Sequence, residues 1–170
     1  MTLAIALLGS HSSDLEQLKY WRDHYIGSNP AREIMFQELE AMRNQASYQF
    51  AFYMHDELVG GARLTSVGHG LTLSERLADV RALTGAQSLL EVNRLVVRED
   101  MRGTTVATDA LRQCFGWVRE WTIHSGLVAL CQPHFVRLYQ RVGARVIAAG
   151  IPAPGISTKQ YSLINLIFEE

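Results

Sequence analysis

A carboxylate precedes an anion-binding loop near the middle of the chain. Glu91 lies in an apolar run from Leu89 to Val97 that is typical of a strand, and Arg102-Gly103 then opens a loop that leads into a helix from about Val106. Backbone N–H groups in the first turn of a helix have no partner within it, and the helix dipole adds partial positive charge there. Together they bind phosphate groups. This order predicts an enzyme that holds a phosphate-tailed donor beside a general base.

Glu91 is the candidate base for acyl transfer to an amine. A protonated amine cannot attack a thioester, so a side chain must take its proton, directly or through a water. Backbone N–H groups near Leu95 are candidates to stabilise the oxyanion that then forms. Strand alternation puts Glu91 and Arg94 on opposite faces unless Asn93 forms a bulge. A structural ion pair of Glu91 with Arg63 or Arg94 is the alternative.

The elements that position these residues are predicted from hydrophobic periodicity and turn residues. Two glycines, Gly60-Gly61, lie inside one strand and indicate a bulge or a close approach of backbone. The predicted strands are Leu3–Leu8, Tyr48–Met54, Leu58–Thr65, Leu89–Val97, Leu127–Cys131, Arg145–Ala149 and Gln160–Phe168. The predicted helices begin at Ser12 or Ser13, at Asn29-Pro30 with Met42 on the apolar side, at Leu71, at Ala107 and at Pro133.

The ends of these helices are predicted from glycines. The strongest helix runs from Ala107 to Ser125, ends at Gly126 and is expected to bury Trp121, and the last helix ends at Gly143. The helix from Leu71 is expected to run to Leu83 as one element, and residues 151–155 to form a loop. This order of elements predicts a mixed sheet flanked by helices.

The donor-side residues resemble the GNAT superfamily of N-acyltransferases. The phosphate loop of that family reads Arg/Gln-x-x-Gly-x-Gly/Ala, and here it is Arg102-Gly103-Thr104-Thr105-Val106-Ala107, with Thr105 in place of the middle glycine. The resemblance implies that these six residues hold the phosphate of the donor, and that Leu95, Val96 and Val97 pair with its pantetheine arm. It also implies an α/β fold whose mixed, mostly antiparallel sheet has a splayed strand pair, with the strand from Val128 to Cys131 moving away to leave the donor slot.

Tyr139 lies in a second match to that superfamily. The run from Phe135 to Arg145 is similar to the late helix of the family, whose tyrosine sits near the donor thiol. A phenol with a pKa of roughly 10 can protonate a leaving thiolate whose thiol has a pKa of roughly 8.5. Tyr139 is therefore the predicted acid, and a tyrosine that only fills the core is the alternative.

A narrower resemblance is to acyl-homoserine-lactone synthases and long-chain N-acyl amino acid synthases, which take acyl groups from acyl carrier protein. The matching runs are Gly60-Gly-Ala-Arg63-Leu64, then Leu71-Thr-Leu-Ser-Glu-Arg-Leu77, then Glu91-Val-Asn-Arg94, with Arg32 and Phe36 upstream. The acidic pair of the lactone synthases is missing, which argues against that class. The resemblance implies that Arg63, Arg94, Arg32 and Phe36 bind the small-molecule acceptor, and a guanidinium such as that of Arg63 can grip a carboxylate with two hydrogen bonds.

Thr105 bears on the identity of the donor. Coenzyme A brings a pyrophosphate that needs close backbone approach, which a β-branched side chain hinders, whereas the phosphopantetheine of a carrier protein brings one phosphate. Arg98, Arg102 and Arg112 could then meet an acidic carrier protein. We therefore expect acyl carrier protein as the donor. An acetyl-CoA-dependent acetyltransferase and a non-catalytic module that binds a pantetheinylated partner are the alternatives.

Composition limits the class of protein further. The 170 residues are predicted to form one domain over residues 1–170, and a net charge of −1 offers no basic face for nucleic acid. Cys114 and Cys131 have no metal-ligand spacing, so we expect reduced thiols and no metal. The first apolar run is too short to span a membrane and lacks a basic start. We therefore expect a cytoplasmic protein.

Overall fold

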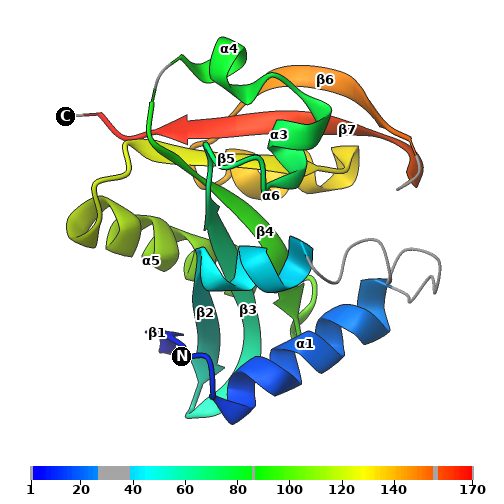
Figure 1. Ribbon diagram of the computed structural model, residues 1–170. Coiled ribbons are helices and arrows are strands. Elements are labelled where there is room, and N and C mark those ends of the chain that lie inside the picture. Colours follow the sequence, from blue (N-terminus) through cyan, green and yellow to red (C-terminus); the bar gives the residue numbers. More distant parts are fainter. Residues whose placement is uncertain (1, 27–38, 86, 155–156, 170) are drawn as a thin grey trace.

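The computed structural model describes residues 2–26, 39–85, 87–154 and 157–169, and among these residues seven strands form one sheet (Figure 1). Their order is β1-β2-β3-β4-β5-β7-β6, and every neighbouring pair is antiparallel except β4 and β5. This confirms the predicted mixed, mostly antiparallel sheet. The strands are β1 Leu3–Leu7, β2 Ser47–Met54, β3 Glu57–Ser66, β4 Leu89–Val97, β5 Gly126–Cys131, β6 Arg145–Ala153 and β7 Ser157–Ile167.

Helices cover both faces of the sheet (Figure 1). On one face lies α5, Val106–Trp121, whose buried residues recur every three or four positions and pack with α6, Val136–Gln140, against β2 to β5. On the other face lie α1, Ser13–Ile26, whose Leu18 packs on Ala51 and Val96, and a helix that includes residues 39–45. Two short helices complete the fold, α3 Leu73–Leu77 and α4 Val80–Thr84.

The parallel pair β4 and β5 separates after three residues. Leu89, Leu90 and Glu91 pair with Gly126, Leu127 and Val128, and no pair follows among the described residues. Beyond this point β4 stays paired with β3, while β5 continues along β7. The splayed strand pair is therefore present, and the two strands diverge directly after Glu91, where the sequence predicts the donor slot.

A bulge distorts β4 just past the start of the slot. Arg94 has a φ of +51°, and the register with β3 shifts between Gly61 and Arg63. The two glycines of β3 allow close contact here, as predicted. A Cβ on Gly60 would lie 2.6 Å from the carbonyl oxygen of Val96, and one on Gly61 would lie 2.5 Å from the side chain of Leu18.

Several predicted helix ends were wrong. The long helix stops at Trp121, since Thr122 adopts an extended backbone, and both its N–H and its hydroxyl donate to the Val118 carbonyl oxygen. Trp121 is consequently 67% exposed rather than buried. Gly126 does not end a helix but begins β5, where a Cβ would lie 2.4 Å from the carbonyl oxygen of Leu166.

The segment from Leu71 forms two helices instead of one. Thr72 caps α3 and Asp79 caps α4, each accepting a bond from the backbone N–H three residues later, so each cap starts its own helix. Residues 151–153, predicted as loop, belong to β6 because that strand stays paired with β7. Met42, predicted on an apolar helix side, is 51% exposed. The last helix, α6, ends at Gln140 instead of continuing to Gly143, and Gly143, with φ +95°, lies in the turn that follows.

Candidate active site

Glu91 lies at the point where β4 and β5 separate. Its side chain is 2% exposed and faces α3. The carboxylate accepts bonds from the backbone N–H of Ser74, at 2.7 Å, and from the Nδ2 of Asn93, at 3.0 Å. Neither Arg63 nor Arg94 pairs with Glu91, so the structural ion pair considered from the sequence is not found among the described residues.

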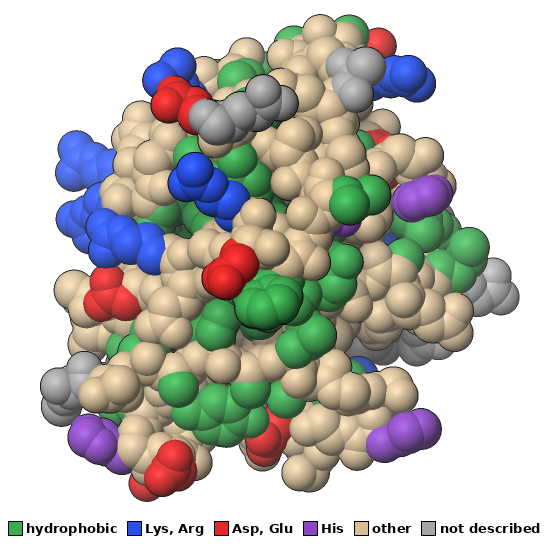
Figure 2. Space-filling model, turned by 90° about the vertical axis from the view of Figure 1, so that its left-hand side faces the viewer, with side chains coloured by type: hydrophobic (Ala, Val, Ile, Leu, Met, Phe, Trp, Pro, Cys, Tyr) green, Lys and Arg blue, Asp and Glu red, His purple; other side chains and the backbone are tan. Residues whose placement is uncertain are grey.

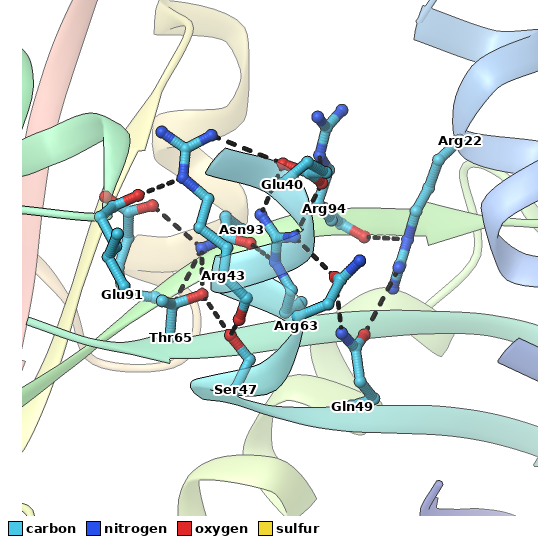
Figure 3. A network of polar contacts seen from close by, with 12 residues as sticks. Arg22, Glu40, Arg43, Ser47, Gln49, Arg63, Thr65, Glu91, Asn93 and Arg94 are labelled. Carbon is cyan, nitrogen blue, oxygen red and sulfur yellow. Dashed lines mark hydrogen bonds and ion pairs between the residues drawn. The ribbon is translucent and has the colours of Figure 1, made fainter. Parts of the chain in front are cut away.

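Arg63 holds an internal carboxylate, that of Glu40. Its Nη1 lies 2.7 Å from Glu40 Oε1 and 2.8 Å from Asn44 Oδ1, and its Nε donates to Asn93 Oδ1 at 2.6 Å (Figure 3). The side chain is only 2% exposed. The predicted direct grip of Arg63 on a substrate carboxylate is therefore not available in this arrangement, because the guanidinium is already occupied and enclosed.

Arg94 reaches the same carboxylate from the bulge. Its Nε lies 3.0 Å from Glu40 Oε1, and the side chain is 32% exposed. The bulge thus brings Arg94 to the face of the sheet that Glu91 occupies, which decides the question that strand alternation left open. Burial on its own would raise the pKa of Glu40, but Arg63 and Arg94 outweigh it and lower the pKa to about 2.

The sequence analysis missed the residues that complete this network. Arg22 of α1 donates from Nε to the Arg94 carbonyl oxygen, at 3.0 Å, and from Nη1 to Gln49 Oε1, at 3.5 Å. Burial, and then repulsion by Arg63 and Arg94, lowers the pKa of Arg22 to about 9. Arg43 donates to Glu40 and to the Leu71 carbonyl oxygen.

One sequence signal could have revealed part of this network. Glu40, Arg43 and Asn44 are spaced three and four residues apart, so they share one side of a helix. That side faces the sheet, while Met42 points outward. From the sequence alone, such a polar stripe indicates a solvent-exposed helix face. Only the buried position of its partner Arg63 shows that the stripe faces the sheet.

Tyr139 approaches the slot from the opposite face. It is 6% exposed and packs in the core that contains Val92 and Phe115. Burial raises its pKa well above the usual value, and the nearby Cys131 and Glu91 add to this shift. Burial also raises the pKa of the Cys131 thiol, to about 11. The phenol therefore stays protonated at neutral pH.

The predicted phosphate loop is open at the start of α5. Residues 102–105 are exposed, and Gly103 adopts a φ of +77°. The first backbone hydrogen bond of helical type in α5 runs from the Asp109 N–H to the Thr105 carbonyl oxygen. The N–H groups of Ala107 and Thr108, which precede it, therefore have no partner within the helix. Thr105 makes no side-chain cap.

Arg102 is fixed over this loop. Its guanidinium lies 3.9 Å from the centre of the Tyr25 ring of α1, and its Nε donates to the Val97 carbonyl oxygen at 3.3 Å. Arg98 is instead engaged by Asp100 and Glu57. In the space-filling view basic side chains gather along one edge of a face on which hydrophobic and acidic groups are interspersed (Figure 2).

Other predicted site residues are placed as follows. Leu95 and Val97 are half-buried and Val96 is buried along the free part of β4. Arg32 and Phe36 lie outside the described residues. Within the described ranges, no cluster of three or more possible metal ligands occurs, and no helix has the length and apolar character needed to cross a membrane.

A family comparison matches almost the whole chain. The model of a family described as N-acyl amino acid synthase FeeM matches residues 12–166. No curated protein matches the sequence.

Solved structures share the fold. The chain is similar to FeeM, an N-acyl amino acid synthase from uncultured soil microbes, with a TM-score of 0.71 and 13% identity over 98% of this chain and 90% of that chain. It is similar to spermidine N-acetyltransferase from Vibrio cholerae in complex with CoA and spermine, with a TM-score of 0.68 and 11% identity over 97% and 95% of the two chains. Arabidopsis thaliana NAA60 in complex with acetyl-CoA gives a TM-score of 0.65 and 18% identity over 98% of each chain.

Proposed function

The chain belongs to the family of the N-acyl amino acid synthase FeeM and is an acyltransferase with the GNAT fold, and from this premise we propose that it moves an acyl chain from acyl carrier protein to the amine of an amino acid. The observation that carries the proposal is the splay of β4 and β5 directly after Glu91, with Tyr139 on the other side of the sheet. A thioester in the slot would lie between a carboxylate and a phenol.

Glu91 takes the proton of the attacking amine in this proposal. Its carboxylate is held by Ser74 and Asn93, and no guanidinium competes for it among the described residues. Removal of the proton frees the nitrogen lone pair for attack on the thioester carbon. The oxyanion that forms is stabilised by N–H groups of β4 on the edge that β5 has left, near Leu95.

Tyr139 then stabilises the departing sulfur. A phenol whose pKa lies far above neutral remains a donor at every working pH. The raised pKa of Cys131 shows that burial disfavours a thiolate beside Tyr139, and a departing thiolate in the slot would experience the same environment. A hydrogen bond from the Tyr139 hydroxyl would therefore stabilise the negative charge on the leaving sulfur in a place where burial destabilises it.

Arg94 is a proposed contact for an acceptor that carries an acid. It is the most exposed guanidinium of the three that border Glu40, and only its Nε is bound to that side chain. Arg63 is assigned a positioning role, because it fixes Glu40, which in turn orients Arg94. Such an arrangement favours an amine that carries an acid, as an amino acid does.

The donor phosphate is assigned to Arg102 and the loop residues Gly103 to Ala107, of which Ala107 has an N–H group without an intrahelical partner. Arg102 has no ion pair with a carboxylate among the described residues, whereas Arg98 and Arg112 are paired with acidic neighbours. Thr105 narrows the loop, which supports the single phosphate of a carrier protein over the pyrophosphate of coenzyme A. Acyl-CoA is the alternative donor for the same residues.

The test measures thiol release by the pure protein with pooled amino acids and matched acyl-CoA and acyl carrier protein donors. We expect turnover with the carrier protein and a preference for long chains. Equal or better turnover with acetyl-CoA would instead identify a conventional acetyltransferase. Donor binding without turnover would indicate a binding module.

Charge reversal tests the docking of the carrier protein. Reversal at Arg98 and Arg102 together is expected to abolish turnover with the carrier protein, whereas Arg119→Glu, at an exposed position near the end of α5, is the control and is expected to have no effect. Unchanged turnover in the double variant would contradict the carrier-protein assignment.

A further inference from the structure

The network behind Glu91 holds more positive than negative groups. Three guanidiniums, those of Arg43, Arg63 and Arg94, contact the carboxylate of Glu40, and that of Arg22 lies beside them at the Arg94 carbonyl oxygen. Glu91 is the only other carboxylate among the labelled residues (Figure 3). All of these arginines but Arg94 are almost fully buried. Buried charge without a partner is costly, so the network is incomplete as it stands.

Three buried polar atoms show where partners are missing. Arg22 Nη2, Arg43 Nη2 and Ser74 Oγ have no hydrogen-bond partner among the described residues. Arg43 is 6% exposed and Ser74 is fully enclosed. An orphaned buried donor costs more than a missing surface contact, and two from different elements in one place call for a ligand.

Arg43 contacts the turn that leads to Ser74, and Ser74 contacts the candidate base. The Nε of Arg43 donates to the Leu71 carbonyl oxygen, three residues before Ser74, and the backbone N–H of Ser74 donates to Glu91 Oε2 at 2.7 Å. The short segment from Leu71 to Ser74 therefore contacts Arg43 at one end and Glu91 at the other, and it carries the unpaired Ser74 hydroxyl. Arg22 lies on the other side of Arg63 and does not share this corner (Figure 3).

We propose that Arg43 Nη2 and Ser74 Oγ bind the α-carboxylate of an amino acid acceptor. The carboxylate supplies the acceptor atoms that both groups lack, and it balances part of the positive charge of the network. Because the α-ammonium and the α-carboxylate share one carbon atom, a carboxylate held there brings the ammonium to Glu91. The inference rests on the proposed function and defines its acceptor as an α-amino acid, rather than an amine with no acid.

Entry of the ligand requires one contact to give way. Arg43 Nη2 and Ser74 Oγ are closed to solvent. The contact between Arg43 Nη1 and Glu40 Oε2, at 3.5 Å, is the longest ion pair among the described residues. If this contact breaks, Glu40 still pairs with Arg63 and Arg94. The ligand carboxylate can therefore take the place of Glu40 at Arg43, and the Glu40 carboxylate keeps two partners.

The test compares Ser74→Ala, Arg43→Gln and the control Arg119→Gln on two acceptors. The acceptors are the best amino acid from a pool of the twenty and its decarboxylated amine. For Ser74→Ala and Arg43→Gln we expect at least a tenfold rise in KM for the amino acid, with a clearly smaller change in kcat/KM for the amine. Ser74→Ala keeps the backbone bond to Glu91, and it removes an unsatisfied hydroxyl, so its melting temperature without ligand is expected to stay equal or rise.

Two outcomes would overturn the subsite. An equal loss on both acceptors, or wild-type kinetics of Ser74→Ala on the amino acid, would mean that these residues do not bind a carboxylate. If wild type shows no turnover, the proposed function fails separately, and the subsite is tested by calorimetric titration of the amino acid pool in the presence of coenzyme A or carrier protein. Weaker binding by Ser74→Ala would support it, and an absence of binding to wild type would sink it.

Discussion

On one face of the sheet the slot is bordered by Glu91 and a buried charged network, and on the other by Tyr139 in an apolar core. Hydrogen bonds of defined direction fix the side chains of the first face, where Arg63 and Asn93 each donate to specific partners. Close packing fixes the second, where shape matters more than direction. Substitutions that keep shape but change polarity should therefore be far more harmful on the charged face.

The largest effect is expected for Glu91→Gln. The amide keeps an oxygen that can accept the Ser74 N–H, so the fold is retained while the proton acceptor is lost. We expect kcat to fall by about 10² to 10⁴. Thiol release measures it, and thermal unfolding verifies that the variant is folded. A loss below tenfold would mean that another group takes the proton.

Glu40→Gln tests whether the charged face depends on pH. The pKa of Glu40 is lowered to about 2 in the fold, so its stabilising contribution is complete above the unfolded pKa and is lost as pH falls towards 2. Between pH 7 and pH 3 wild type should lose about 2 kcal/mol of unfolding free energy that the variant does not lose. Urea unfolding at the two pH values measures this difference. Equal losses in both proteins would show that Arg63 and Arg94 do not stabilise the charged Glu40.

Tyr139→Phe is the matching change on the apolar face. The ring still fills its place beside Phe115, so we expect unfolding free energy to change by less than about 1 kcal/mol. The lost hydroxyl should lower kcat about tenfold with an unchanged KM for the donor. Steady-state kinetics with varied donor separates these quantities. An unaltered kcat would make Tyr139 a core residue only.

The smallest effect is expected for Thr105→Gly in the phosphate loop. A glycine lets the backbone approach a pyrophosphate, so the ratio of kcat/KM for acyl-CoA to that for carrier protein should rise severalfold. Thr104→Gly is not a matched control, since the Thr104 hydroxyl accepts from Val106 and donates to Met101. Thr122→Gly, outside the slot, is not expected to alter the ratio. An unchanged ratio for Thr105→Gly would remove the steric argument for the carrier protein.

The same contrast explains what the sequence could predict. The strand that contains Glu91, the loop before α5 and the close approach at Gly60-Gly61 carry local signals, because each depends on neighbouring residues. The pairing of Arg63 with Glu40 joins residues 23 positions apart through a helix whose docking no local pattern specifies. Trp121 was misplaced because its spacing fits a buried stripe, while the helix ends there.

Arg94 shows the same limit within a single strand. Its side depends on a bulge, and the bulge depends on contacts with other elements, among them the Arg22 bond to the Arg94 carbonyl oxygen. Strand alternation alone could not decide whether Arg94 lies on the face opposite Glu91 or, with a bulge, on the same face. Positions supported by contacts across the fold are therefore the ones that a sequence pattern leaves open.

Helix α1 contacts residues of both proposed substrate sites. Arg22 donates to the carbonyl oxygen of Arg94, the proposed acceptor contact, and Tyr25, one turn later, packs against Arg102, the proposed phosphate contact. The spacing of three residues puts both contacts on one side of the same rigid rod. A tilt of α1 would move both contacts together. A substitution that weakens the packing of Leu18 should therefore raise the KM of the donor and the KM of the acceptor alike.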